Sequence, residues 1–114
     1  MIYQIVFSVS YPNYTNLTEI EIHKSFIKSL GENINKDDRF QTHDNCWFVN
    51  SELSANDLSC MIVVPNINII ITQINHNIAG LTFTTFWDWL KEKNLPLEEI
   101  GTEEMFINSN LKDK

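Results

Sequence analysis

The order of hydrophobic and polar residues divides this chain into short blocks that alternate between strand-like and helix-like periods. The strand-like blocks are rich in Ile, Val and aromatic residues, and turn-forming Asn, Asp, Ser or Pro residues bound them. The helix-like blocks place their apolar residues three or four positions apart. Together they predict strands over residues 2–9, 39–42, 46–50 and 66–75, and helices over residues 17–31, 55–64 and 85–93.

The order strand, helix, strand, strand, helix, strand is typical of the α+β, ferredoxin-like βαββαβ sandwich. Right-handed crossovers then place two helices on one face of a four-stranded antiparallel sheet, and the chain adds a C-terminal helix. The apolar run 66–75 predicts a central strand with both faces covered. Apolar positions on the other sheet face need cover, which a second copy supplies, so a homodimer is expected.

Small polar residues precede each predicted helix and are expected to cap it. In the first helix, Ile20, Ile27 and Leu30 fall near one face, and Gly31 is expected to end the helix. The candidate N-caps are Thr15 or Asn16 for the first helix, Ser51 or Ser54 for the second, and Thr82 or Thr84 for the third.

The length of 114 residues is that of one domain. We expect one ferredoxin-like domain over residues 1–94 and an acidic tail over residues 95–114, in which residues 105–107 could add an edge strand to a partner's sheet. The net charge is −7 and Arg39 is the only arginine, which disfavours a phosphate-binding surface for nucleic acid. An acidic surface suits a basic protein partner instead.

Signals for secretion, membrane insertion and cofactor binding are missing from the sequence. No apolar run approaches the roughly 20 residues of a membrane span, and the N-terminus has no basic region or cleavage site typical of a signal peptide. Cys46 and Cys60 match neither a disulfide framework nor a zinc motif. We therefore expect a cytoplasmic protein with reduced thiols and with no metal or cofactor.

Two stretches resemble a known family. The hairpin and second helix read HDNCWFVNSELSANDL, and the last helix reads AGLTFTTFWDWLKEKN. They are similar to small bacterial proteins described as SinR-like, which share the fold of the CRISPR adaptation endonuclease. The ribonucleases of the virulence-associated protein D type are more distant relatives. The resemblance covers residue 3 to about residue 94 and implies a homodimer of ferredoxin-like protomers packed through their sheets.

The resemblance also implies where a metal would bind in the nuclease branch, because an Asp ends the first strand there. In this sequence Ser8 occupies that position, and Ser10 supplies no carboxylate either. A neutral hydroxyl cannot replace a carboxylate as an anionic anchor for Mg²⁺. The leading hypothesis is therefore a non-catalytic homodimeric interaction module without catalytic residues.

Two alternatives stay open. The first is a toxin-like endoribonuclease, metal-dependent or metal-independent, that uses His43 or Asp44 for acid–base chemistry. The second is a small-ligand binder with a pocket at the dimer seam. A metal site of His23, His43 and His76 is not expected, because no pair has the i, i+4 spacing of a helical site.

Five aromatic residues are expected to lie in the core or at the dimer contact. Within the last helix, Phe86 and Trp89 share one apolar stripe, whereas Trp87 falls off that stripe and is a candidate contact residue. Stacking on single-stranded nucleic acid would also need a basic groove. The five are Trp47, Phe83, Phe86, Trp87 and Trp89.

Overall fold

The computed structural model describes residues 1–75, 78–80 and 84–93 of the chain. Strands and helices alternate in the order that the sequence predicts. The strands are β1 (Ile2–Val9), β2 (Arg39–His43), β3 (Cys46–Asn50) and β4 (Ile67–Gln73), and the helices are α1 (Glu19–Asn33), α2 (Ala55–Met61) and α3 (Thr84–Glu92), with a short 3₁₀ helix η1 (Lys36–Asp38) before β2. The tail beyond residue 94 and its expected edge strand lie outside the described residues.

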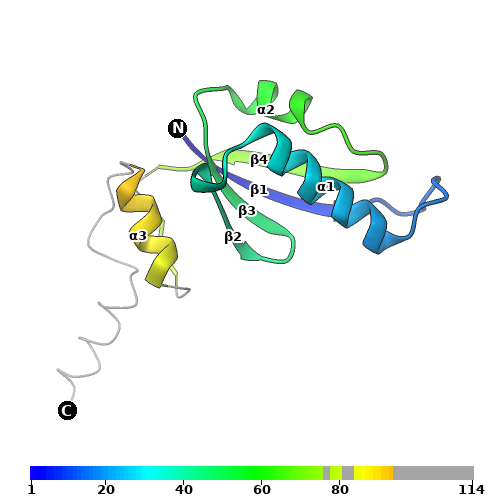
Figure 1. Cartoon of the computed structure of the whole chain (residues 1–114), viewed down its shortest axis with the longest axis horizontal. Coiled ribbons are helices and arrows are strands. Elements are labelled where there is room, and N and C mark those ends of the chain that lie inside the picture. The colour runs from blue at the N-terminus through cyan, green and yellow to red at the C-terminus, as the bar shows by residue number, and fades with distance from the viewer. Residues whose placement is uncertain (76–77, 81–83, 94–114) are drawn as a thin grey trace, which may run out of the picture.

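The four strands form one antiparallel sheet in the order β2-β3-β1-β4. Helices α1 and α2 cover one face of this sheet, and α3 lies apart from them (Figure 1). These observations confirm the α+β class, the four-stranded antiparallel sheet and the three helices. Among the described residues, no helix combines the length and apolar character that crossing a membrane requires.

The main core lies between the sheet and the α1–α2 layer. In β1, Tyr3, Ile5 and Phe7 point toward the helices because alternate residues of a strand face opposite sides. Phe26 of α1 stacks on Phe7 with ring centroids 3.8 Å apart, and Leu58 of α2 is fully buried in the same cluster. The helix-facing side of the sheet therefore carries the larger apolar cluster.

The second apolar cluster lies on the opposite sheet face, which we call the open face, and α3 covers part of it. Phe86, Trp89 and Leu90 of α3 are buried against Phe48 of β3 and Phe40 of β2. Part of the face that the sequence leaves for a second copy is thus covered by the chain's own third helix. The expected stripe of Phe86, Trp89 and Leu90 does face the core.

The position of β4 corrects one expectation, because β4 is an edge strand and not a central one. Its Ile67, Ile69 and Ile71 pack against the helix-side core, whereas Ile70 is 68% exposed on the open face. Residues of β4 alternate between the two sheet faces, so Asn68, Ile70 and Thr72 point away from the core. The run of isoleucines hides this alternation in the sequence because Ile occurs on both faces.

The first helix begins and ends later than the sequence predicts. Thr18, and not Thr15 or Asn16, is the N-cap. The Glu21 amide donates to Thr18 Oγ1 over 3.2 Å, and the Thr18 amide donates to Glu21 Oε1 over 3.4 Å, which is a capping box. This later start turns Ile22, Phe26 and Leu30 inward and leaves Ile20 exposed.

Replacing Thr18 by Ala should destabilise the fold by about 0.5–2 kcal/mol, because it removes the hydroxyl that accepts the Glu21 amide and donates to Glu21 Oε1. Asn16→Ala is the matched control and should change the free energy of unfolding by less than about 0.5 kcal/mol. Urea unfolding monitored by circular dichroism measures both. Equal losses in the two variants would contradict the assignment of the cap.

Gly31 lies inside α1 and does not end it. A Cβ atom at Gly31 would lie 3.1 Å from Nη1 of Arg39, so the missing side chain makes room for the guanidinium group. Arg39 Nη1 donates to the carbonyl of Ile34, the residue that follows the helix, over 2.8 Å. Arg39 therefore closes the C-terminal end of α1, the role that the sequence assigns to glycine.

Candidate functional site

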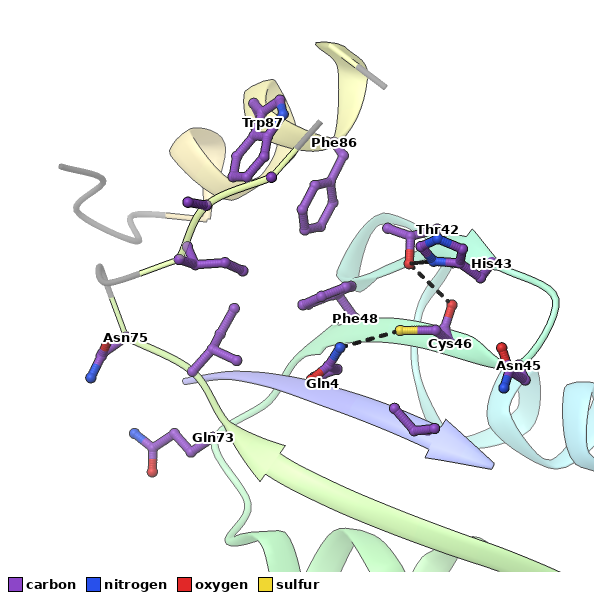
Figure 2. Close-up of a pocket in the computed structure, with 15 residues that line it drawn as sticks. Gln4, Thr42, His43, Asn45, Cys46, Phe48, Gln73, Asn75, Phe86 and Trp87 are labelled. Atoms are coloured by element: carbon purple, nitrogen blue, oxygen red, sulfur yellow. Dashed lines mark hydrogen bonds between the residues drawn. The ribbon is translucent and has the colours of Figure 1, made fainter. Parts of the chain in front are cut away.

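A groove with a volume of about 620 Å³ lies on the open face of the sheet, between the strands, the segment after β4 and helix α3. Figure 2 shows Gln4 and Cys46 on its floor and Phe86 and Trp87 on the α3 side. A groove of this size is typical of sites for small organic ligands. It is lined by Gln4, Val6, Thr42, His43, Asn45, Cys46, Phe48, Gln73, Ile74, Asn75, Ile78, Ala79, Gly80, Phe86 and Trp87.

Helix α3 forms one wall of the groove, and specific contacts hold it against the sheet. The ring centroids of Phe86 and Phe48 lie 4.6 Å apart. At the other end of the helix, Trp89 Nε1 donates to the Asp37 carbonyl over 2.8 Å, and Lys93 Nζ lies 3.2 Å from Asp38 Oδ1. The Asp37 carbonyl and the Asp38 carboxylate on η1 therefore anchor α3, so the wall is built by aromatic packing, a hydrogen bond and an ion pair.

The polar groups on the groove floor come from adjacent strands. Gln4 Nε2 donates to Cys46 Sγ over 3.5 Å. Thr42 Oγ1 donates to the Cys46 carbonyl over 3.5 Å and lies 3.1 Å from His43 Nδ1 (Figure 2). Cys46 is buried, whereas the other free thiol, Cys60, is exposed on α2. The floor thus offers amide, hydroxyl, imidazole and thiol groups beside apolar side chains.

Among the residues that the structure describes, no Asp, Glu, Lys or Arg side chain lines the groove. Strands β1, β3 and β4 contain no such residue, and Arg39 of β2 bonds to the end of α1. The acidic residues of the described chain lie on helices, on η1 and in loops. In a chain with a net charge of −7, the groove is therefore an uncharged surface.

Trp87 is a wall residue, which the sequence expects in the core or at the dimer contact but not in a groove. It is 4% exposed, and its Nε1 atom is buried without a hydrogen-bond partner in the structure. A buried donor without a partner costs about 1–3 kcal/mol. Trp87 reaches the groove from the opposite side of α3 to Trp89, which is why it falls off the helical stripe. In the sequence, the position of Trp87 away from the apolar stripe of the last helix was the feature that marked it as a contact residue.

Ser8, the residue at the expected acid position, lies outside this groove. It lines a smaller pocket of about 300 Å³ together with Glu19 and His23 of α1 and Asn45. The His23 Nε2 atom lies 3.1 Å from the Asp44 carbonyl, and its ring meets Phe7 edge-on at 5.0 Å. Within residues 1–75, 78–80 and 84–93, no three His, Cys, Asp or Glu side chains gather in a way that could hold a metal ion.

The structure does not bring His43 and Asp44 together as an acid–base pair. The His43 ring lines the groove and contacts the Thr42 hydroxyl, whereas Asp44 lines neither pocket and offers its carbonyl to His23. Among the aromatic candidates, Trp47 packs against the helix-side core, and His76 and Phe83 lie outside the described residues. The groove thus combines three residues that the sequence singles out, His43, Phe86 and Trp87, with others that it does not, such as Gln4, Phe48 and Gln73.

Comparison with protein-family models, with curated proteins and with solved structures finds no match to this chain.

Proposed function

We propose that this protein is a non-catalytic, homodimeric interaction module with a ferredoxin-like fold, and that its groove binds an uncharged, partly aromatic ligand. The observation that carries the proposal is a groove of about 620 Å³ whose described lining residues include no Lys, Arg, Asp or Glu, in a chain with a net charge of −7. An acidic protein that keeps one concave surface free of charge avoids the desolvation cost of burying charged groups on binding.

The ferredoxin-like assignment is supported by connectivity. The antiparallel sheet has the order β2-β3-β1-β4, and the crossover helices α1 and α2 pack on the same face. A split βαβ unit repeated twice produces this arrangement, because each right-handed crossover returns its helix to one side of the sheet.

The chemistry of the lining indicates the class of ligand. Phe48, Phe86 and Trp87 offer aromatic surface, and the Gln4 and Gln73 amides offer both donors and acceptors. Such a mixture of apolar walls with few polar groups is usual for small organic ligands. A flat, neutral molecule with hydrogen-bonding edges fits this combination, whereas an anion would find neither Lys nor Arg among the described lining residues.

Two dyes with one scaffold test the proposal. N-phenyl-1-naphthylamine is uncharged, and 8-anilino-1-naphthalenesulfonate carries an added sulfonate. We expect the neutral dye to bind with increased fluorescence and the anionic dye to bind at least tenfold more weakly. Val6→Lys, which places a charge on the groove floor, should weaken the neutral dye at least tenfold. Asn68→Lys adds the same charge on the same face outside the groove and should change the dissociation constant less than twofold.

Equal binding of the two dyes, or binding that Val6→Lys leaves intact, would contradict the proposed groove. The non-catalytic part has its own test with labelled RNA, incubated with Mg²⁺ or with a chelator. We expect no cleavage, because none of the described residues that line the groove with His43 is a Lys or Arg that could hold a phosphate. Cleavage that is lost in His43→Ala would overturn this part and favour the endoribonuclease alternative.

The homodimer is supported by the uncovered strip of the open face on β1 and β4. Val6 is 37% exposed and pairs in register with Ile70, which is 68% exposed. Both strands are uncharged, so two acidic copies can approach there without placing like charges in contact.

A further inference from the structure

The outer edge of β4 carries backbone groups without partners. Ile74 donates its amide to the Ile2 carbonyl over 2.9 Å, and Ser10 donates its amide to the Asn66 carbonyl over 2.8 Å. In an antiparallel ladder such bonds recur at every second residue, so even-numbered residues of β4 bond to β1. Odd-numbered residues then turn their N–H and C=O groups outward, and none of these groups has a hydrogen-bond partner in the described part of the chain. The odd-numbered residues of β4 are Ile67, Ile69, Ile71 and Gln73.

The two edges of the sheet differ in how they are protected. Strand β2 begins with Arg39, has a register shift between Gln41 and His43, and packs against η1 and α3. A charge and a bulge of this kind prevent pairing with another chain. Strand β4 has seven residues with no charge and no proline, and its register with β1 is regular throughout. The edge at β4 is therefore open to a further strand.

The sequence of β4 is complementary to itself about Ile70, its central residue. In an antiparallel pair centred there, Ile69 would face the partner's Ile71, and Ile67 would face the partner's Gln73. All four residues turn their backbone groups outward, so they can exchange hydrogen bonds with the second copy. Ile70 meets the partner's Ile70 at a non-hydrogen-bonded position, where side chains approach most closely.

We propose that β4 pairs with β4 of a second copy about a two-fold axis at Ile70, which joins the two sheets into one. This inference rests on the homodimer of the proposed function and supplies its interface. The exposed Ile70 side chains then cover each other and continue the apolar strip of Val6 on each side. Every residue of β4 is uncharged, so a chain of net charge −7 places no like charges along this axis.

Charge pairs test the register. In the proposed pair, residue 68 faces residue 72 of the partner on the open face, and both side chains are exposed in one subunit. Their neighbours on β1, Ser8 and Gln4, are uncharged, so new charges repel nothing within the subunit. Two double variants place like charges opposite each other: Asn68→Lys with Thr72→Lys, and Asn68→Glu with Thr72→Glu. Asn68→Glu with Thr72→Lys places opposite charges there.

Sedimentation velocity over a range of protein concentrations gives the dimer dissociation constant of the full chain. We expect both like-charge variants to raise it at least tenfold and the opposite-charge variant to keep it within threefold of the unsubstituted chain. The double Lys variant has a smaller net negative charge than the unsubstituted chain, and the double Glu variant has a larger one. Weaker dimerisation in both variants therefore cannot come from the change in net charge.

Each other outcome has a definite meaning. A dimer that all three variants leave unchanged would overturn the β4 interface while the homodimer stands, and would point to packing through the open sheet face. A monomer at micromolar concentration in the unsubstituted chain would overturn both. Binding of the neutral dye to the unsubstituted chain is independent of either result, because the groove lies within one subunit.

Disulfide trapping gives a second measurement with no added charge. In a Cys60→Ser background, Ile70→Cys should form a disulfide-linked dimer, because residues paired at a non-hydrogen-bonded antiparallel position have Cα atoms about 4.5 Å apart. Asn68→Cys should not, since its thiol would face Thr72 of the partner subunit. Cross-linking at residue 68 but not at residue 70 would overturn the register.

Discussion

Replacing Phe86 by Ala is expected to destabilise the fold and to abolish ligand binding in the groove. Phe86 is 2% exposed and joins α3 to the sheet, with ring centroids 4.6 Å from Phe48 and 5.5 Å from Phe40. Removing a buried phenyl ring costs about 3–5 kcal/mol, which is a large part of the 5–15 kcal/mol total typical of a small domain. Because Phe86 also lines the groove, its loss removes part of the wall that a ligand would contact.

Urea unfolding and a titration with the neutral dye measure the two effects of Phe86→Ala. We expect the dissociation constant of the dye to rise more than tenfold at urea concentrations where the sheet remains folded. Asp88→Ala on the exposed side of α3 is the control, and it should change stability by less than about 0.5 kcal/mol and leave dye binding unchanged. Full dye affinity in Phe86→Ala would contradict the role of α3 as the groove wall.

Phe26→Ala should cost a similar free energy of unfolding without loss of the groove. Phe26 is fully buried on the opposite side of the sheet, where it stacks on Phe7. We expect a loss of about 3–5 kcal/mol, because the rigid sheet cannot collapse into the space of a missing ring. Phe26→Leu keeps most of the volume and should lose less than Phe26→Ala.

The same two assays separate Phe26→Ala from Phe86→Ala. At urea concentrations below the unfolding transition, Phe26→Ala should bind the neutral dye within twofold of the unsubstituted chain, because no atom of Phe26 lines the groove. Lys24→Ala, an exposed substitution on the same helix, should leave both quantities unchanged. A tenfold loss of dye binding in Phe26→Ala would show that the two sheet faces are coupled and would contradict this separation.

Local signals predicted the elements of this fold well where side-chain chemistry acts over a few residues. Ser54 caps α2 as expected, since its hydroxyl accepts the Asp57 amide over 3.1 Å. The hairpin turn between β2 and β3 follows from Asp44 and Asn45, which favour turns, whereas His43 is the last residue of β2. The limits of α1 were harder to predict, because several polar residues before it could cap a helix and the capping box at Thr18 decides between them.

The candidate site was not predictable in the same way. Gln4, Cys46, Phe48, Gln73 and Trp87 come from four different elements, and no motif links them along the chain. Their meeting depends on the sheet order and on where α3 packs. The sequence singled out Ser8, His43 and Asp44, but the structure places Ser8 in another pocket and Asp44 in neither.

The sequence by itself determined the α+β class, the order of strands and helices, and the uncharged character of β1, β3 and β4, because these follow from local periodicity and composition. Only the tertiary structure decided that β4 lies at an edge, that α3 covers part of the open face, and that a groove forms beside it. The physical reason is that an isoleucine-rich strand has the same pattern at the centre and at the edge of a sheet. Which face of the sheet a helix covers depends on packing between residues that are distant in the sequence.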